Sequence, residues 1–457
     1  MPLTQAQAAA FDCRVTMSRR FEWVAGLTLA AGMILVAGCV TAPSTEELAR
    51  RVEQGTGGGF ILKTNANALT LPPGVTSLEQ LSEDDAVAIA LWNNAAFQEA
   101  LAGLGFNRAD LLQAKQLRNP SLIVLFPAGP KQLEFTALFP IESLWLLPRR
   151  VAVAEMDLEA AAGQLVASGL NLVRDVRVAC AELELAGNRL RAVQDSVRWW
   201  DETVKFTERR LELGDASALE LAQVRADALV ARQTVGRLER DQTLAHERLR
   251  LLLGLANEPS KFSLRLAPVV TEPLPLQAEL LKQALAARPE LRANELVLEG
   301  ARERGQLAKG ELLMVSALLD ANNTATGMQY GPGLDVTLPI FHQNQGARSR
   351  ADTMARQAIL RHITLRDRIL LDVREAVVRR NQAVNELTAS RERVVPALES
   401  AVAHARRAYE LGDADPQSFL TAERRLSDAR AIEAESLAEV RRAEAELARA
   451  VGRRFQD

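Results

Sequence analysis

The chain has 457 residues, of which 4% are aromatic and 25% are charged, and its formal net charge is −3. This length would suit two or three ordinary domains, but the low aromatic content favours long helices packed side by side over a bulky globular core. The near-neutral charge excludes the basic surface that a nucleic-acid-binding protein needs.

Residues 1–38 are predicted to be an export signal. Arg19 and Arg20 supply its positive region, and the apolar stretch 24–37 is too short for a transmembrane helix. Met17 would begin a signal of ordinary length, which makes it the alternative start of the protein.

Residues 35–39, with the sequence Leu-Val-Ala-Gly-Cys, resemble a bacterial lipobox. The resemblance implies that the Cys39 thiol is acylated, for example with palmitate, and that Cys39 becomes the first residue of the mature chain. Several acyl chains on one cysteine anchor a protein stably. Val40 follows the cysteine in place of Asp, which implies the outer membrane. Since Cys13 lies upstream, only Cys180 remains as a free thiol and no internal disulfide is possible.

Residues 39–81 are rich in Thr, Pro, Gly and Asn and are predicted to be a lipidated linker. The glycines at 55–59 do not indicate a nucleotide site, because no strand precedes them and no Gly-Lys-Ser/Thr follows. A helix is expected over 82–118, with Ser82 and Asp85 as its capping pair.

The next elements are a hairpin and a long rod. Two short strands joined by a proline-rich turn are predicted at 122–126 and 133–139. An unbroken helix from Arg149 to Leu213 would be about 100 Å long, far beyond a globular helix. Leu213, Gly214 and Asp215 end this rod, and a second helix returns to Leu253.

An irregular segment at 259–275 and a short helix at 276–287 precede a second half with the same plan. Its predicted elements are a helix that begins at Pro289, strands at 312–319 and 334–340 around a Gly/Asn/Thr-rich loop, a rod at 345–411, and a return helix that ends near 451. Leu411, Gly412 and Asp413 end the second rod, and Pro396 is expected to kink it.

Local matches between the halves indicate an internal duplication. Leu-Glu-Phe-Thr at 133–136 parallels Leu-Asp-Val-Thr at 334–337, and Leu-Gly-Asp-Ala occurs at both 213–216 and 411–414. The expected domains are the signal 1–38, the linker 39–81, a first repeat 82–255, an equatorial segment 256–288 and a second repeat 289–457.

Heptad spacing in the second half predicts coiled-coil seams. On the rod the seam residues are Ile363, Leu370, Val373, Val377, Val384 and Leu387. On the return helix they are Leu426, Val440 and Leu447, with Ala422, Ala429, Ser436, Ala443 and Ala450 in the other register. Small residues at alternate positions allow close helix approach. An ordinary bundle within one chain is the alternative interpretation.

Four strands are too few to close a membrane barrel, for which the smallest number is eight. An open sheet edge cannot face lipid, so strands that enter a membrane must share one barrel with other chains.

Motifs along both halves resemble those of the TolC-type outer-membrane efflux family, over nearly all of the mature sequence. They are Asn119-Pro120, Leu252-Leu-Gly-Leu255, Arg288-Pro-Glu-Leu-Arg292, Leu338-Pro-Ile-Phe341 with Asn344-Gln-Gly346, and Tyr409-Glu-Leu-Gly412. The resemblance implies a mainly α fold: coiled-coil helices in a trimeric α-barrel, four short strands per chain in a shared outer-membrane β-barrel, and an internal two-fold repeat.

The same resemblance implies partners and sites. The expected partners are two further copies in a homotrimer, a periplasmic adaptor (membrane fusion) protein, an inner-membrane pump and outer-membrane lipid, with no nucleic acid. The adaptor would contact the two tips, Leu213-Gly214-Asp215 and Leu411-Gly412-Asp413. The pump supplies the energy, so the channel needs no cofactor and no metal.

The sequence departs from this family in its strands and its gate. The first hairpin is crowded by prolines, and 312–319 is nearly all apolar where a barrel strand should alternate. Some members carry acidic gate residues after the tip glycine, but Ser418 and Thr421 stand near those positions here, so the gate is not transferred.

No enzyme motif competes with this interpretation. His246-Glu247 lacks the second histidine of a zinc-protease helix, and the four histidines are scattered, as expected for solvated helix faces. The predicted function is a passive outer-membrane exit duct of a tripartite efflux pump for drugs, metals or other small molecules. The alternatives are the channel of an ABC-type (type I) secretion or export system, and a periplasmic lipoprotein scaffold without a barrel.

Overall fold

The computed structural model describes residues 59–60, 69–127, 133–258, 262–269, 271–324, 327–411, 413 and 416–452. The predicted signal at 1–38, Cys39 and most of the linker at 39–81 lie outside the described residues. The described residues are mostly helical and belong to one compact unit. No helix within these ranges combines the length and the apolar content that crossing a bilayer requires.

The first predicted helix is in fact two helices. The elements here are β1 (Gln80–Ser82), α3 (Glu83–Asn93) and α4 (Ala95–Ala114). The predicted cap of α3 is confirmed: Ser82 Oγ accepts from the Asp85 amide at 3.1 Å, and Asp85 Oδ2 accepts from the Ser82 amide at 3.0 Å. Asn94 divides the helix because its backbone is extended and its side chain caps the start of α4.

The first rod is α5 (Glu142–Leu213), a helix of 72 residues and therefore about 108 Å long. It begins at Glu142 and not at the predicted Arg149. Pro148 lies inside it, but near the N-terminal end, so the hydrogen bond that proline removes is not lost from the middle of the rod. As predicted, α6 (Ala218–Leu252) returns along α5.

The segment between the two hairpins contains β4 (Ser263–Arg265), α7 (Gln277–Ala287) and then α8 (Pro289–Gly310). Pro289 occupies the start of α8 as predicted. The sequence does not predict β4, which pairs in parallel with β1, with Leu81 opposite Leu264. Three-residue strands are too short to carry a readable periodicity.

The second rod is interrupted. It consists of α9 (Gln345–Ala389), a π-helical turn (Ser390–Val394) and α10 (Val395–Leu411), after which α11 (Pro416–Val451) returns. The predicted kink at Pro396 corresponds to this π-turn, which ends at Val394, two residues before the proline. A π-turn absorbs one extra residue within a continuous helix, and this is one way in which a helix accommodates a residue without an N–H.

The four longer strands form one antiparallel sheet in the order β2-β3-β5-β6. They are β2 (Ser121–Leu125), β3 (Glu134–Pro140), β5 (Val315–Thr324) and β6 (Gly327–Val336). The predictions for β2 and β3 are confirmed to within one or two residues. The second hairpin was placed wrongly: most of the predicted loop between 320 and 333 belongs to β5 and β6, each of 10 residues.

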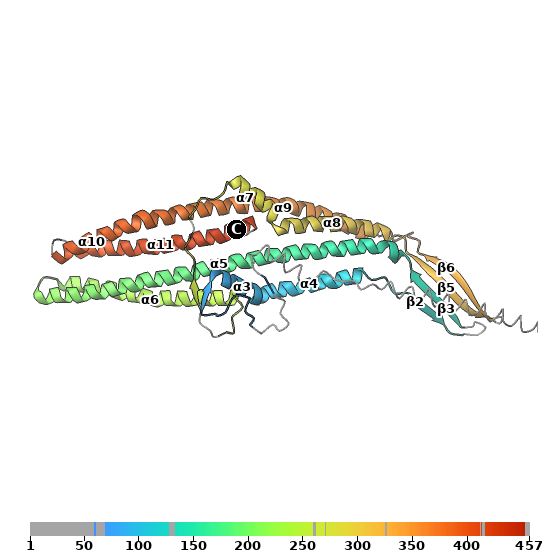
Figure 1. Ribbon diagram of the computed structural model, residues 1–457, viewed down its shortest axis with the longest axis horizontal. Coiled ribbons are helices and arrows are strands. Elements are labelled where there is room, and N and C mark those ends of the chain that lie inside the picture. The colour runs from blue at the N-terminus through green and yellow to red at the C-terminus, as the bar shows by residue number, and fades with distance from the viewer. Residues whose placement is uncertain are drawn as a thin grey trace, which may run out of the picture. The chain divides into compact units, whose positions relative to one another are not determined.

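The long helices lie side by side, with the sheet at one end of α5 and α8 (Figure 1). α5 contacts both α6 and α11, and α11 in turn contacts α9 and α10. The two helical hairpins are therefore joined through α5 and α11. The largest apolar core lies where α3 and α4 meet α5 and the end of α6.

The predicted seams are mostly confirmed. Val373, Val377, Val384 and Leu387 on α9 are buried, as are all predicted residues of α11 except the half-buried Ala422. The prediction is wrong at the start of the α9 seam, where Ile363 is 44% exposed and Leu370 is half-buried. Ile369 is buried in their place, because α7 and α8 contribute Leu280 and Leu291 to the core at that level.

Candidate functional site

The first tip is a glycine-terminated helix end. α5 stops at Leu213, and Gly214 adopts a left-handed backbone with φ of +84°. The Asp215 amide then donates to the Arg210 carbonyl at 2.8 Å, the bond expected of a Schellman end. Ser217 caps α6 by accepting from the Glu220 amide. Leu213 is 78% exposed, so the reversal presents an apolar side chain to the outside.

The second tip is built in the same way. α10 ends at Leu411, and the Asp413 amide donates to the Ala408 carbonyl at 2.9 Å, five residues back as at the first tip. Leu411 is 76% exposed, and Asp413 is exposed as well. Gly412 lies outside the described residues. Both tips therefore carry an exposed leucine directly before the reversal, with an aspartate two residues after that leucine.

Aromatic rings join the two hairpins just above the tips. Trp199 of α5 lies edge-on to Phe419 of α11, with ring centroids 5.0 Å apart, and Phe206 of α5 lies 5.4 Å from Tyr409 of α10. Tyr409 also stacks on Phe419. These ring contacts hold α5 against α10 and α11 near the tips, in a chain that has few aromatic residues. This cluster is not predicted from the sequence, although the close spacing of Trp199, Trp200 and Phe206 indicates it.

Ion pairs hold α5 against α11 further from the tips. Arg441 donates from Nε to Glu184 at 2.6 Å, and Arg442 pairs with Glu182 at 2.8 Å. Arg189 pairs with Glu435 in the same row. Cys180 lies buried beside this row, and its burial raises the pKa of the thiol to about 12. Cys180 is thus a free thiol, as predicted, and an unreactive one.

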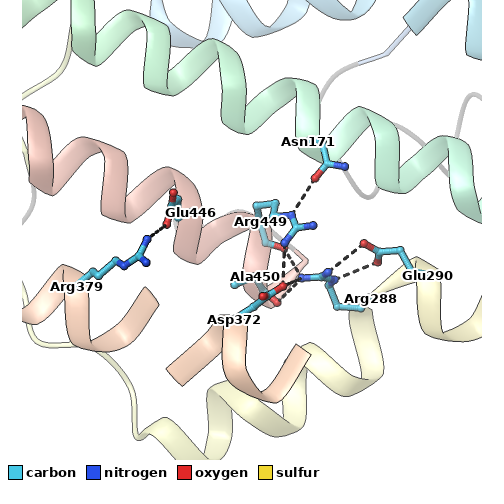
Figure 2. A network of polar contacts seen from close by, with 8 residues as sticks. All are labelled: Asn171, Arg288, Glu290, Asp372, Arg379, Glu446, Arg449 and Ala450. Atoms are coloured by element: carbon cyan, nitrogen blue, oxygen red, sulfur yellow. Dashed lines mark hydrogen bonds and ion pairs between the residues drawn. The ribbon is translucent and has the colours of Figure 1, made fainter. Parts of the chain in front are cut away.

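A second polar cluster lies where the chain passes from α7 to α8 (Figure 2). Arg288, only 5% exposed, donates to both carboxylate oxygens of Glu290, at 3.1 and 3.0 Å. Its Nη1 also donates to the Ala450 carbonyl at 3.2 Å and lies 3.6 Å from Asp372. Arg288 therefore ties the C-terminal end of α11 to α8 and α9.

Arg449 extends this cluster to the first rod. It donates to Asp372 Oδ2 of α9 and, from Nε, to Asn171 Oδ1 of α5, both at 2.9 Å (Figure 2). Burial and the neighbouring Arg288 lower the pKa of Arg449. The Arg288 motif, singled out in the sequence for its resemblance alone, thus has a structural role: the cluster connects both halves of the chain.

The sheet has two chemically different faces. Residues paired directly across strands share a face, so the register separates them. One face carries apolar side chains: Leu122, Val124, Phe135, Ala137, Phe139, Ala317, Leu319, Ala321, Tyr330 and Leu334. The other carries Ile123, Leu125, Leu138 and Leu318 but also Glu134, Thr136, Ser316, Asp320, Asn322, Gln329 and Asp335. The predicted lack of alternation near 319 is therefore wrong, because β5 extends to residue 324.

Hydrogen bonds fix the polar groups on the second face. Thr136 Oγ1 donates to Asp320 Oδ1 at 2.9 Å, and Asn322 Nδ2 donates to Asp320 Oδ2 at 2.7 Å. The four described strands carry three carboxylates, Glu134, Asp320 and Asp335, and no Lys or Arg. This face therefore carries all three carboxylates beside four apolar side chains, while the opposite face is apolar.

Nothing in the described part of the chain resembles a metal centre: no group of three or more His, Cys, Asp or Glu side chains is placed to hold an ion. The expectation that His246 lies on a solvated face is wrong. Its ring stacks on Phe262, with centroids 4.1 Å apart, and its Nε2 lies 3.2 Å from the Phe262 carbonyl.

Comparison with known proteins finds similarity to outer membrane efflux proteins. A family model described as "Outer membrane efflux protein" matches residues 89–255. The probable outer membrane lipoprotein SilC of Salmonella typhimurium is 23% identical over 268 residues, and the cation efflux system protein CusC of Escherichia coli K12 is 24% identical over 270. Each alignment covers 56% of this chain and 58% of the relative, so the chain matches less than two thirds of either relative's length.

Structural similarity covers more of the chain than sequence similarity does. A crystal structure of CusC superposes with a TM-score of 0.68 at 19% identity, covering 86% of this chain and 98% of that one. The helical rods, the four-stranded sheet and the family-model match agree with one another. Residues 89–255 of the chain therefore match the outer membrane efflux protein family, and the chain shares the fold of CusC.

Proposed function

We propose that this protein is the outer-membrane channel subunit of a tripartite efflux system. It is a passive duct without catalytic function or cofactor, held in the outer membrane by its sheet and by the acylated Cys39. Its helices extend into the periplasm. Its partners are two further copies, a periplasmic adaptor and an inner-membrane pump that supplies the energy.

The sheet carries this proposal. One face is apolar along the paired strands, and the other carries the polar side chains and all three carboxylates beside some apolar ones. β5 and β6 have the ten residues that a tilted membrane-spanning strand needs. Among the strands that the structure describes, β2 and β6 each have a neighbour on one side only. Unpaired backbone groups cannot face hydrocarbon, so the edges must meet those of other copies. Three copies would give twelve strands, with the polar faces around an aqueous lumen.

The helices support the same closure. α6 and α9 carry exposed apolar residues opposite the faces that pack within the chain: Leu229, Leu244 and Leu251 on α6, and Leu360, Leu371 and Val378 on α9. These two helices lie at the ends of the row α6-α5-α11-α9. An interface between α6 of one copy and α9 of the next is heterologous, and a heterologous interface closes into a ring when its rotation returns to the first copy. The ring would be the predicted trimeric α-barrel, in which the exposed apolar faces of α6 and α9 are covered by neighbouring copies.

The tips are the proposed contact with the adaptor. Leu213 and Leu411 lie at the reversal of each helical hairpin and are 78% and 76% exposed. A helix reversal requires only the glycine, so the repeated exposed leucine favours a docking surface over turn chemistry alone.

The similarity to a cation efflux system protein and the acidic face of the sheet favour metal cations among the possible cargoes. An aqueous lumen lined by carboxylates concentrates cations and repels anions. An ABC-type export channel would share the same duct, and identification of the inner-membrane pump that copurifies with the protein would distinguish the two.

Two measurements on the full-length protein in mild detergent test the proposal. Light scattering should give three chains per particle, and reconstitution into a planar bilayer should give discrete conductance steps. Trimers without conductance would contradict the channel and favour the periplasmic scaffold. A stable monomer would contradict both the shared barrel and the ring of helices.

A further inference from the structure

All four junctions between sheet and helices lie at the same end of the sheet. Pro140 pairs with Ser316, Val315 pairs with Val336, and Ser121 pairs with Leu138. The start of β2, the end of β3, the start of β5 and the end of β6 are therefore level with one another. The chain crosses this level at residues 115–120, 141–150, 311–314 and 337–350.

Each of these crossings carries exposed apolar side chains. We call them the collar: Leu117, Leu144, Trp145, Leu313, Met314, Leu338, Ile340 and Phe341. Phe341 is 93% exposed, more than any other large apolar residue in the described part of the chain. Leu338, Ile340 and Phe341 belong to the segment between β6 and α9, which forms neither strand nor helix. An apolar surface of this extent indicates a binding partner.

The same four segments carry a net positive charge. They contain two acidic residues, Glu142 and Glu311, and six basic ones: Lys115, Arg118, Arg149, Arg150, Arg348 and Arg350. Lys115 and Arg149 form ion pairs with Glu155 and Glu303 outside these segments, which leaves an excess of two positive charges. Glu142 is buried and lies 3.8 Å from Arg118. Arg348 and Arg350, in the first turns of α9, are exposed and form no ion pair with another described residue. The strands on the other side of the collar carry only acidic charges.

We propose that the collar is a phospholipid-binding surface that sits in the headgroup layer of the membrane, with Trp145 and Phe341 at the level of the headgroups and Arg348 and Arg350 on their phosphates. This inference rests on the proposed function, because it requires the sheet to enter the membrane. Aromatic side chains favour the boundary between hydrocarbon and water, and arginines beside it reach the phosphate oxygens.

Charge favours lipid over a second copy as the occupant. In a ring of identical chains, neighbouring collars lie at the same height, so each excess of two positive charges, which includes the exposed Arg348 and Arg350, would face another one. Anionic headgroups remove that repulsion, and each basic side chain close to an anionic surface adds to the attraction. The charge of the collar therefore favours contact with anionic phosphate groups over contact with the collar of a second copy.

Nitroxide labels test the position of the collar in the reconstituted trimer. With Cys180→Ala as background, one label is attached at Phe341→Cys and another at Tyr330→Cys, on the apolar face of the sheet. Collisions with oxygen, which dissolves in lipid, and with a water-soluble nickel chelate report depth. The Tyr330 label should be deep in the hydrocarbon, and the Phe341 label should lie at headgroup depth.

The other outcomes separate the two proposals. A deep Tyr330 label with a Phe341 label in free water would overturn the collar and leave the channel intact. A Phe341 label that is immobile and shielded from both probes would mean that a second copy covers it. A Tyr330 label in water would overturn the membrane position of the sheet, and with it the proposed function.

A charge variant tests the phosphate contact independently of depth. Vesicles of phosphatidylcholine and phosphatidylglycerol supply the lipid, and the measured quantity is the enrichment of phosphatidylglycerol around the protein. Arg348→Gln with Arg350→Gln should lower this enrichment, by roughly fivefold for each arginine removed. The control is Arg361→Gln with Arg368→Gln, which removes the same charge from exposed positions further along α9. Equal enrichment in both double variants would overturn the phosphate contact.

Discussion

The guanidinium group of Arg210 lies over the ring of Tyr409, with its Cζ atom 5.1 Å from the ring centroid. Arg210 belongs to the last turn of α5 and Tyr409 to the last turn of α10, and both contact Glu220 at the start of α6. The ends of three helices are thus fixed to one another within a turn of the tips.

The Tyr409 ring is predicted to hold the two hairpins together near the tips. Tyr409→Ala removes the contacts with Phe206, Phe419 and Arg210 and should lower the local free energy of opening by about 3 kcal/mol. Tyr409→Phe keeps the ring and loses only a long hydrogen bond of 3.5 Å, so it should cost less than about 1 kcal/mol. Amide hydrogen exchange in the last turns of α5 and α10 measures both. Unchanged protection in the alanine variant would contradict this role.

The exposed leucines of the tips are predicted to bind the adaptor. Leu213→Asp with Leu411→Asp should leave the trimer intact, because neither side chain packs within the chain, but should abolish adaptor crosslinking and resistance to the exported compounds. Leu213→Met with Leu411→Met is the control, since it preserves an apolar surface of similar volume. If the aspartate variant reaches the outer membrane and supports full export, the tips are turns only.

Arg288 is predicted to stabilise the whole chain. Arg288→Ala leaves Glu290, Asp372 and the end of α11 without their shared partner, and loss of one member of a buried ion pair costs about 3 kcal/mol or more. Arg292→Ala in the same motif removes only an exposed pair with Glu295 and should cost less than about 1 kcal/mol. The melting temperature in detergent measures the difference, and equal melting of the two variants would contradict the prediction.

Cys180 should make the protein less stable at high pH. Its pKa rises from 9.0 to about 12 on folding, so between these values the unfolded chain loses a proton that the folded chain keeps. The contribution of the neutral Cys180 thiol to the stability of the folded state is complete below pH 9 and is lost as the pH rises toward 12. Wild type should therefore lose more stability than Cys180→Ala between pH 9 and pH 11. Parallel denaturation profiles of the two proteins would show that the thiol does not contribute.

The lipid anchor is predicted from the sequence alone. Cys39→Ser should abolish incorporation of labelled palmitate and slow the processing of the precursor, because the acylated atom is the cysteine sulfur. Equal labelling of the two proteins would refute the anchor. The mutant should keep partial export activity, since the sheet and the helices also hold the protein in place.

Features fixed by neighbouring residues could be predicted from the sequence. The cap at Ser82, the start of α8 at Pro289 and the reversal at Gly214 each depend on backbone chemistry within a few residues. The length of the rods follows from the absence of proline and turn residues over many turns.

Features fixed by contacts between distant residues could not be predicted from the sequence. The Gly-Pro-Gly sequence at 331–333 is typical of a loop, yet it lies in β6 because cross-strand pairing with β5 overrides local preference. The Arg288 cluster joins residues of α5, α8, α9 and α11, and no sequence spacing indicates such a partnership. The aromatic cluster at the tips likewise combines residues about two hundred positions apart.

The π-turn at 390–394 shifts the coiled-coil phase of the second rod. Before the turn, buried residues recur every seven positions at Val373, Arg380 and Leu387; after it, they recur every seven at Val395, Val402 and Tyr409. The step from Leu387 to Val395 is eight, so the turn behaves as a one-residue insertion that leaves both stripes facing inward. The rod should therefore tolerate deletion of a single residue at this point and at no other. Elsewhere the loss of one residue would rotate every later side chain by about 100° around the helix axis.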